Sequence, residues 1–224
     1  RRHAAHVAGC SLVHQHAGLA FDALDLRQLH RPEADVPSRL AGDVEVLLDH
    51  IGVDQAVVGG VSGGSGVALR FALRRPGRTA GLVLVKPVYA GEERGYTEQQ
   101  KATFAMMDAV ASRALDEGVQ VLRPLYASLP PPMREGALAM LEGLDAASVV
   151  ATSHFVASGA QPFASYADLR SVHAPTLLVR GDDPIHPAEV SDLYAANIPN
   201  CTVAPASTVD IAAAIGAFCD QSIN

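Results

Sequence analysis

One segment of the chain carries a pattern with a direct chemical meaning. Residues 60–64 read GVSGG, so that Gly60, Ser62 and Gly64 match G-x-S-x-G. Where a buried strand precedes this pattern and a helix follows it, the glycines permit a sharp turn that exposes the serine hydroxyl as a nucleophile. The amides and partial positive charge at the N-terminus of that helix would face an oxyanion forming there. The alternative is a glycine-rich turn with only a structural role.

The residues on either side of the serine predict the strand and the helix that this chemistry needs. Residues 54–61 form an apolar run typical of a buried parallel strand, and residues 63–75 form a helical segment that Pro76 ends. Two other glycine-rich sites do not match. A phosphate-binding loop requires G-x-x-x-x-G-K-[ST] and a dinucleotide site requires G-x-G-x-x-G, and neither pattern is completed here. We therefore expect a nucleophile elbow at Ser62.

The rest of the chain alternates predicted strands with predicted helices. Strands are expected at residues 20–26, 81–87, 175–180 and 201–204, and helices at 36–51 and 208–219. This order predicts an α/β fold with a doubly wound, mostly parallel sheet. Residues 88–174 show helical periodicity without a convincing strand, which predicts a helical lid insertion. The expected parts are residues 1–87 with the elbow, the lid at 88–174, and residues 175–224, which complete the core.

Composition limits the partners and the compartment. The 224 residues carry 17 basic and 24 acidic side chains, a formal charge of −7, and no long basic cluster, which argues against nucleic acid as a partner. No apolar run approaches the ~18 residues of a membrane span. Three cysteines, an odd number without metal-ligand spacing, favour a reducing, cytoplasmic compartment. The histidines among the first 16 residues have no accompanying ligands, so we expect a solvated, frayed terminus, no metal and no cofactor.

Two longer segments resemble the α/β-hydrolase family. Residues 43–87 are similar to that family's helix, elbow strand, nucleophile helix and following strand, and residues 174–199 are similar to its acid-bearing strand and loop. The resemblance extends from about residue 20 to the C-terminus. It implies a catalytic triad in the chain order Ser, Asp, His. By this resemblance Ser62 is the nucleophile and the amide of Gly63 donates one hydrogen bond to the oxyanion.

The acid implied by the resemblance follows the strand at 175–180, where Asp182 and Asp183 compete. Asp183 directly precedes Pro184, Ile185, His186 and Pro187, the kind of segment that usually follows the family's acid. We therefore favour Asp183, and we expect its carboxylate to face the loop 204–210. As surface carboxylates beside a helix, both residues would have no catalytic role.

The base is less clear, because the loop 204–210, where the family carries its histidine, contains none. Two histidines remain as alternatives. His186 would have to reach both the carboxylate and the serine from the same loop as Asp183, and it would otherwise be an ordinary loop or helix-cap residue. His154, in the expected lid, would otherwise be a packed helix position.

The N-terminal part also departs from the family. Members of the family carry a His-Gly loop after an early strand, and that loop supplies a second oxyanion amide. Only 19 residues precede the strand expected at 20–26, and His16-Ala17-Gly18 lies too close to it for an intervening helix. We therefore expect the early strands of the sheet to be missing from this chain.

Two functions from different classes are compatible with this sequence. In the first, the protein is a serine hydrolase that cleaves an ester or similar acyl bond. In the second, it is a degenerate member of the family that binds a small apolar ligand or a partner without turnover. Apolar side chains in the insertion suggest a small-molecule acyl or aromatic substrate, although such residues also form ordinary cores; they are Phe104, Met106, Met107, Phe155 and Phe163. The oligomeric state is not predicted.

Overall fold

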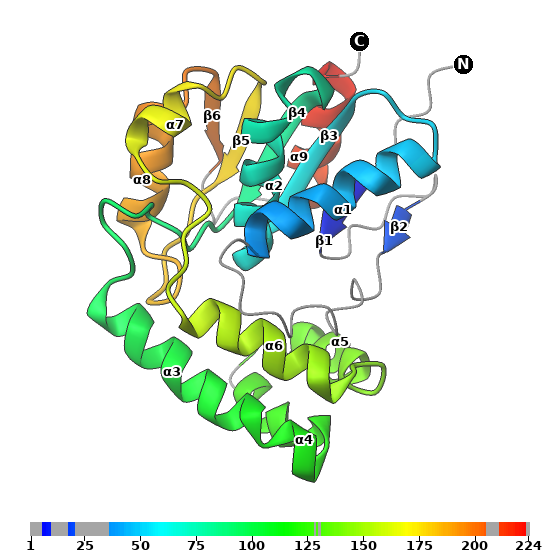
Figure 1. Cartoon of the computed structure of the whole chain (residues 1–224), viewed down its shortest axis with the longest axis vertical. Coiled ribbons are helices and arrows are strands. Elements are labelled where there is room, and N and C mark those ends of the chain that lie inside the picture. The colour runs from blue at the N-terminus through cyan, green and yellow to red at the C-terminus, as the bar shows by residue number, and fades with distance from the viewer. Residues whose placement is uncertain are drawn as a thin grey trace. The chain divides into compact units, whose positions relative to one another are not determined.

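The structure is a computed structural model of the chain, and it describes residues 6–9, 18–20, 36–127, 129, 131–204 and 211–222. These residues form two compact units (Figure 1). One unit holds the sheet and comprises the first two strands, Pro37–Tyr96 and residues 161–222. The other is helical and spans Thr97–Ala160. Each unit is described separately below.

The sheet unit contains six parallel strands in the order β2-β1-β3-β4-β5-β6. The strands are β1 (His6–Gly9), β2 (Gly18–Ala20), β3 (Ala56–Val61), β4 (Thr79–Val85), β5 (Thr176–Val179) and β6 (Cys201–Ala204). Its helices are α1 (Val36–His50), α2 (Gly63–Arg74), α7 (Tyr166–Arg170), α8 (Ala188–Asn197) and α9 (Ile211–Ser222), with a 3₁₀ turn at Pro76–Arg78. The predicted α/β fold with a parallel sheet is confirmed.

Alternation along the strands divides the sheet into two buried faces, because successive side chains point in opposite directions. Val58, Leu82 and Leu84 pack in one core with residues of α1, α2 and α8. Val83 and Val85 pack in a second core with residues of α9. Figure 1 shows α2 and α9 on opposite faces of the strands. Apolar runs of this kind are therefore buried on both sides, as expected for a parallel sheet covered by helices.

The parallel arrangement brings the ends of three strands to one edge. The register pairs Val61 of β3 with Val85 of β4, and Val85 with Val179 of β5. The segments that follow these strands therefore begin side by side. In open α/β sheets this carboxyl edge is the usual place for a site.

The helical unit consists of α3 (Glu98–Ser112), α4 (Ala114–Glu117), α5 (Pro131–Leu141) and α6 (Ala146–Ala157), with a 3₁₀ segment at Val119–Tyr126. Thr97 and Gln100 form a capping box that starts α3, and Asp145 caps α6 by accepting from the amide of Ser148 at 2.9 Å. Ala111, Leu122 and Leu141 are buried at the centre of a small apolar core.

Two features differ from the sequence analysis. Residues 88–96 and 161–174, which we grouped with the insertion, belong to the sheet unit. Residues 6–9, expected to lie in a frayed terminus, form β1, which pairs with both β2 and β3. In the predicted strand at 20–26, Ala20 is the last residue of β2, and residues 21–26 lie outside the described part of the chain.

Candidate active site

Ser62 lies in the turn between β3 and α2, with φ 54° and ψ −121°. A positive φ is strained for a residue with a side chain, and such strain is often found at functional sites. The backbone around it is tied down, because the Ser62 amide donates to the Val85 carbonyl at 2.9 Å and the Ser62 carbonyl accepts from the Ser65 amide at 3.0 Å. The turn thus holds Ser62 in a conformation that an unrestrained serine avoids.

The Ser62 hydroxyl is free from the usual task of a serine at the start of a helix. A serine at this position normally accepts a hydrogen bond from an amide of the first turn. Ser62 is the N-cap residue of α2, yet its side chain makes no capping hydrogen bond. Its Oγ instead lies 2.9 Å from Nε2 of His186. The first turn of α2 carries no acidic side chain, so its amides meet no fixed negative charge there.

Glycines allow the strand and the helix to cross closely at this turn. A Cβ on Gly60 would overlap the carbonyl of Gly64 and lie 2.7 Å from the Ser65 nitrogen. A Cβ on Gly66 would overlap the ring of Tyr89, which packs against the first turn of α2. Gly60, the first glycine of the G-x-S-x-G pattern, is therefore required by space, and so is Gly66 in the helix.

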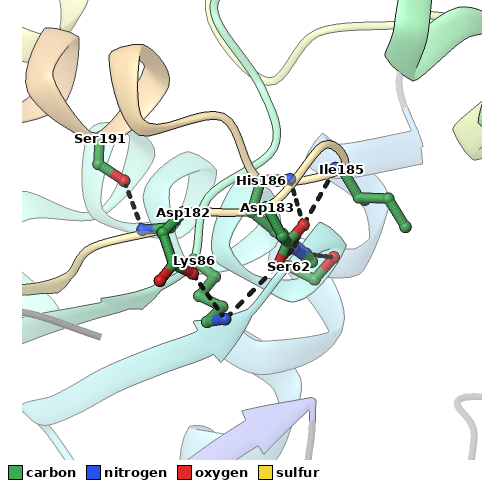
Figure 2. A network of polar contacts seen from close by, with 8 residues as sticks. Ser62, Lys86, Asp182, Asp183, Ile185, His186 and Ser191 are labelled. Carbon is green, nitrogen blue, oxygen red and sulfur yellow. Dashed lines mark hydrogen bonds and ion pairs between the residues drawn. The ribbon is translucent and has the colours of Figure 1, made fainter. Parts of the chain in front are cut away.

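The loop between β5 and α8 carries the other two polar partners, and Figure 2 shows them with Ser62. Oδ1 of Asp183 accepts from the amides of Ile185 at 3.0 Å and His186 at 2.9 Å. At the start of the loop, the Gly181 amide donates to Ser191 Oγ at 3.0 Å, and a Cβ on Gly181 would overlap the His186 carbonyl. These contacts close the loop on itself and fix the backbone of His186.

The His186 ring lies between the carboxylate and the serine. Its Nδ1 is 2.8 Å from Oδ1 and 2.9 Å from Oδ2 of Asp183, and its Nε2 faces Ser62 Oγ. The His186 side chain is 16% exposed and that of Asp183 is 37% exposed. The site is therefore partly shielded, and its hydrogen bonds compete with little water at the imidazole.

The charge state of Asp183 determines how the ring is protonated. Burial opposes ionisation of this carboxyl, but hydrogen bonds from the ring and amide of His186 and from the Ile185 amide outweigh it, so the pKa of Asp183 is lowered from its usual value. An ionised carboxylate only accepts hydrogen bonds, so Nδ1 must carry a proton. Nε2 of neutral His186 is then an acceptor for the Ser62 hydroxyl. This is the arrangement of a nucleophile, a base and a group that orients the base.

The structure differentiates between the residues singled out in the sequence. Asp183 contacts His186, whereas Asp182 is 57% exposed and contacts only Lys86 among the side-chain partners resolved for it. His154, expected to be packed, is exposed in α6 and its Nδ1 lies 2.7 Å from Asp108 Oδ1 within the helical unit. Residues 205–210, most of the loop that Asp183 was expected to face, lie outside the described chain.

One charged residue of this site is not predicted from the sequence. Lys86 directly follows β4, and its Nζ lies 3.4 Å from both Asp182 Oδ1 and Asp183 Oδ2 (Figure 2). The available signal was a lysine placed immediately after the apolar run of residues 81–85. In the part of the chain that the structure describes, no three His, Cys, Asp or Glu side chains are grouped to hold a metal ion. No helix there is both long and apolar enough to cross a membrane.

Comparison with known proteins gives a consistent picture. The family model described as alpha/beta hydrolase fold matches residues 27–209. None of the curated proteins compared with the chain matches its sequence significantly. Among solved structures, a thermophilic esterase from Thermogutta terrifontis is 24% identical, with a TM-score of 0.65, 87% of this chain covered and 75% of that one.

Two further solved structures show the same fold at lower identity. A carboxylesterase from Nitrososphaera gargenis is 13% identical, with a TM-score of 0.68 and coverage of 85% of this chain and 74% of that one. The 2-hydroxy-6-oxo-6-phenylhexa-2,4-dienoate hydrolase from Rhodococcus sp. strain RHA1 is 17% identical, with a TM-score of 0.59 and coverage of 82% and 69%. At these identities the likeness concerns the fold alone.

Proposed function

Because this chain belongs to the alpha/beta hydrolase fold family, we propose that it is a serine hydrolase that cleaves an ester or a similar acyl bond. Ser62 is the nucleophile, His186 the base, and Asp183 the group that orients the base. The single observation that carries the proposal is the continuous set of contacts from Ser62 Oγ through the His186 ring to Asp183, at 2.9 Å and 2.8 Å. These distances lie within hydrogen-bond reach for proton transfer.

The first half of the reaction follows from this geometry. Ser62 Oγ attacks the acyl carbon while Nε2 of His186 removes the hydroxyl proton, and Asp183 stabilises the imidazolium that results. The carbonyl oxygen becomes an oxyanion, which faces the Gly63 amide at the N-terminus of α2 in the nucleophile elbow. When the intermediate collapses, the bond to the leaving alcohol breaks and the alcohol takes the proton from Nε2. An acyl group then remains on Ser62.

Water completes the cycle by the same route in reverse. His186 takes a proton from a water molecule, the hydroxide formed attacks the acyl carbon, and the bond to Ser62 Oγ breaks with return of the proton to the serine. One ester and one water yield one carboxylic acid and one alcohol. Every proton transfer in this scheme uses Nε2, so His186 has to remain within reach of Ser62 throughout.

The acyl class of substrate is favoured by the comparisons and by the helical unit. The similar structures include an esterase and a carboxylesterase. The helical unit contains a cavity of about 290 Å³ with an apolar lining that includes Phe104, Met107, Leu125 and Val156. We propose that the substrate is a small acyl or aromatic molecule and that the helical unit, whose own cavity fits an apolar group, acts as a lid.

Two of the four hydroxyl side chains that line this cavity, Ser148 and Thr152, already donate hydrogen bonds to nearby groups. Ser148 Oγ donates to Asp145 Oδ2 at 2.9 Å, and Thr152 Oγ1 donates to the Ser148 carbonyl at 2.8 Å. The hydrogen bonds that these two hydroxyls donate therefore end within or beside α6. The lining carries no charged residue. An uncharged, mostly apolar group matches such a lining best.

The proposal is tested with a fluorophosphonate probe and with p-nitrophenyl esters. The wild-type protein should become labelled and should release p-nitrophenol, and Ser62→Ala should abolish both. His186→Ala should lower kcat by about 10⁴-fold or more, because removal of a triad base leaves only oxyanion and binding contributions. KM should change by less than about 3-fold.

The controls separate this function from its alternative. His154→Ala changes a histidine of the helical unit and should leave kcat within about 2-fold. Labelling that survives Ser62→Ala would reveal another nucleophile. A wild-type protein that neither reacts with the probe nor hydrolyses esters, yet binds apolar ligands, would favour the degenerate, non-hydrolytic reading of the chain.

A further inference from the structure

Lys86 shares an unusual backbone conformation with Ser62. Among the described residues, these two are the only non-glycine residues with positive φ, at 47° for Lys86 and 54° for Ser62. They follow the paired strand ends Val85 and Val61 directly. Non-glycine residues adopt this conformation only where the surroundings impose it, and such strain is concentrated at functional sites.

The backbone of Lys86 is held by the neighbouring strand. Its amide donates to the Val179 carbonyl of β5 at 2.9 Å, just as the Ser62 amide donates to Val85 of β4. The backbone of each residue is thus held by a hydrogen bond to the last residue of the next strand in the sheet. Lysine is not a residue that favours positive φ, whereas glycine and asparagine are. The identity of this residue is therefore not explained by its backbone.

The side chain supplies an explanation. The Lys86 ammonium contacts Asp182 Oδ1 and Asp183 Oδ2, each at 3.4 Å, and the Lys86 side chain is 30% exposed. Asp183 divides its partners between its two oxygens. Oδ1 accepts the two loop amides, while Oδ2 faces Lys86, and the His186 ring lies near both. Besides the His186 ring, Lys86 is thus the partner of the second oxygen, which accepts neither of the two loop amides.

We propose that Lys86 is a positioning residue for His186. Its ammonium fixes the rotation of the Asp183 carboxylate, and its positive charge disfavours a second positive charge on the adjacent imidazole. This inference deepens the proposed function and rests on it for the role of His186.

A second cation near this loop, Arg180, is paired with a carboxylate other than Asp183. Arg180, at the end of β5, is engaged by Asp192 through contacts of 3.0 and 2.8 Å, and Asp182 and Glu189 also act on its charge. Residues 59–69, which include the turn that carries Ser62, contain no charged side chain. The groups that bear on the imidazole from these elements are accordingly Asp182, Asp183 and Lys86.

The experiment follows the titration of the His186 ring by NMR in the full-length protein, with its signals identified by their loss in His186→Ala. Lys86→Gln removes the charge and should move the titration midpoint to higher pH by about 0.5 to 1 unit, less than a directly contacting charge would cause. Lys86→Arg keeps the positive charge, so the titration midpoint of this variant should lie within about 0.2 unit of the wild-type midpoint. The acid limb of kcat/KM should move with the midpoint.

Two control variants make the result specific. Asp182→Asn removes the other partner of Lys86 and should shift the midpoint downward or not at all. Lys101→Gln neutralises an exposed lysine of the helical unit, which is paired with Glu98, and should change nothing. A Lys86→Gln midpoint equal to that of wild type overturns the proposal. So does a loss of kcat/KM that is equal at every pH and is not restored by Lys86→Arg.

The NMR measurement separates this proposal from the proposed function. If the wild-type protein hydrolyses no ester and takes up no fluorophosphonate, the proposed function fails, while the titrations of Lys86→Gln and Lys86→Arg still decide the coupling between Lys86 and His186. If hydrolysis is present and the midpoint does not move, the hydrolase assignment stands and the role of Lys86 is wrong.

Discussion

Ser62 departs from two local preferences of the polypeptide chain. It holds a positive φ, which costs about 1–3 kcal/mol for a residue with a side chain, and it gives up a helix cap worth about 1 kcal/mol. The hydrogen bond to His186 is the interaction its hydroxyl makes instead. The conformation of Ser62 therefore makes the fold less stable than a relaxed residue that caps the helix would. Such a loss of stability is typical of functional sites.

This strain gives a stability prediction for Ser62. Glycine adopts positive φ without penalty, whereas alanine keeps the strain and loses the hydroxyl. We therefore expect Ser62→Gly to be more stable than Ser62→Ala by about 1 kcal/mol after allowance for the greater entropy of unfolded glycine. In a chain of this size that corresponds to a difference in Tm of about 2–4 °C. Equal melting temperatures in calorimetry would mean that the turn is relaxed.

At the scale of elements, the site depends on how closely β3 and α2 cross. The space at Gly60 is filled by the backbone of Gly64, which cannot move without displacing the first turn of the helix. In contrast, Gly216 lies within α9 and a Cβ there would meet nothing within 4 Å. Replacement of glycine by alanine should therefore have opposite effects on stability at these two positions.

The two glycines provide a matched pair of substitutions. Gly60→Ala should lower the free energy of unfolding by more than about 2 kcal/mol, because overpacking against backbone forces a shift of the turn, and should reduce labelling of Ser62. Gly216→Ala should raise the free energy of unfolding by about 0.5–1 kcal/mol through helix propensity alone. Denaturant unfolding measures both values. A Gly60→Ala protein of wild-type stability would contradict the close crossing.

The elements were largely predictable from the sequence, whereas the contacts between them were not. The apolar runs predicted β3, β4, β5 and β6 within two residues at each end, because buried parallel strands have a distinct pattern. The sequence does not predict β1, because Val7 and Ala8 are too short an apolar run and the strand depends on pairing with β3. Strand formation there is a tertiary effect.

The candidate site was predictable to a similar extent. The G-x-S-x-G pattern and the position of Asp183 after a strand pointed to the turn and the loop that the structure brings into contact. The direction of the His186 ring did not follow from the sequence, because it depends on the loop backbone that Gly181 and Asp183 determine together. The position of Lys86 in the site was not predicted for the same reason, since the local sequence pattern indicates neither its positive φ nor the direction of its side chain.

At the scale of the whole molecule, the chain divides its polar and apolar functions between two compact units. The candidate catalytic side chains all belong to the sheet unit, and the apolar cavity belongs to the helical unit. The contacts that hold the candidate catalytic residues and those that line the cavity therefore belong to separate cores.

The short separation of His186 from Asp183 has a consequence for how the site is assembled during folding. These two residues are three positions apart, whereas His186 and Ser62 are 124 positions apart. Closure of a short loop takes well under a microsecond, while contacts distant in sequence form much more slowly. The contact between Asp183 and His186 can thus form early, whereas the contact with Ser62 requires β3, β4 and β5 to pair first. Under the proposed chemistry, the first fluorophosphonate reactivity in a refolding chain marks the moment when both β3 and β5 are paired with β4.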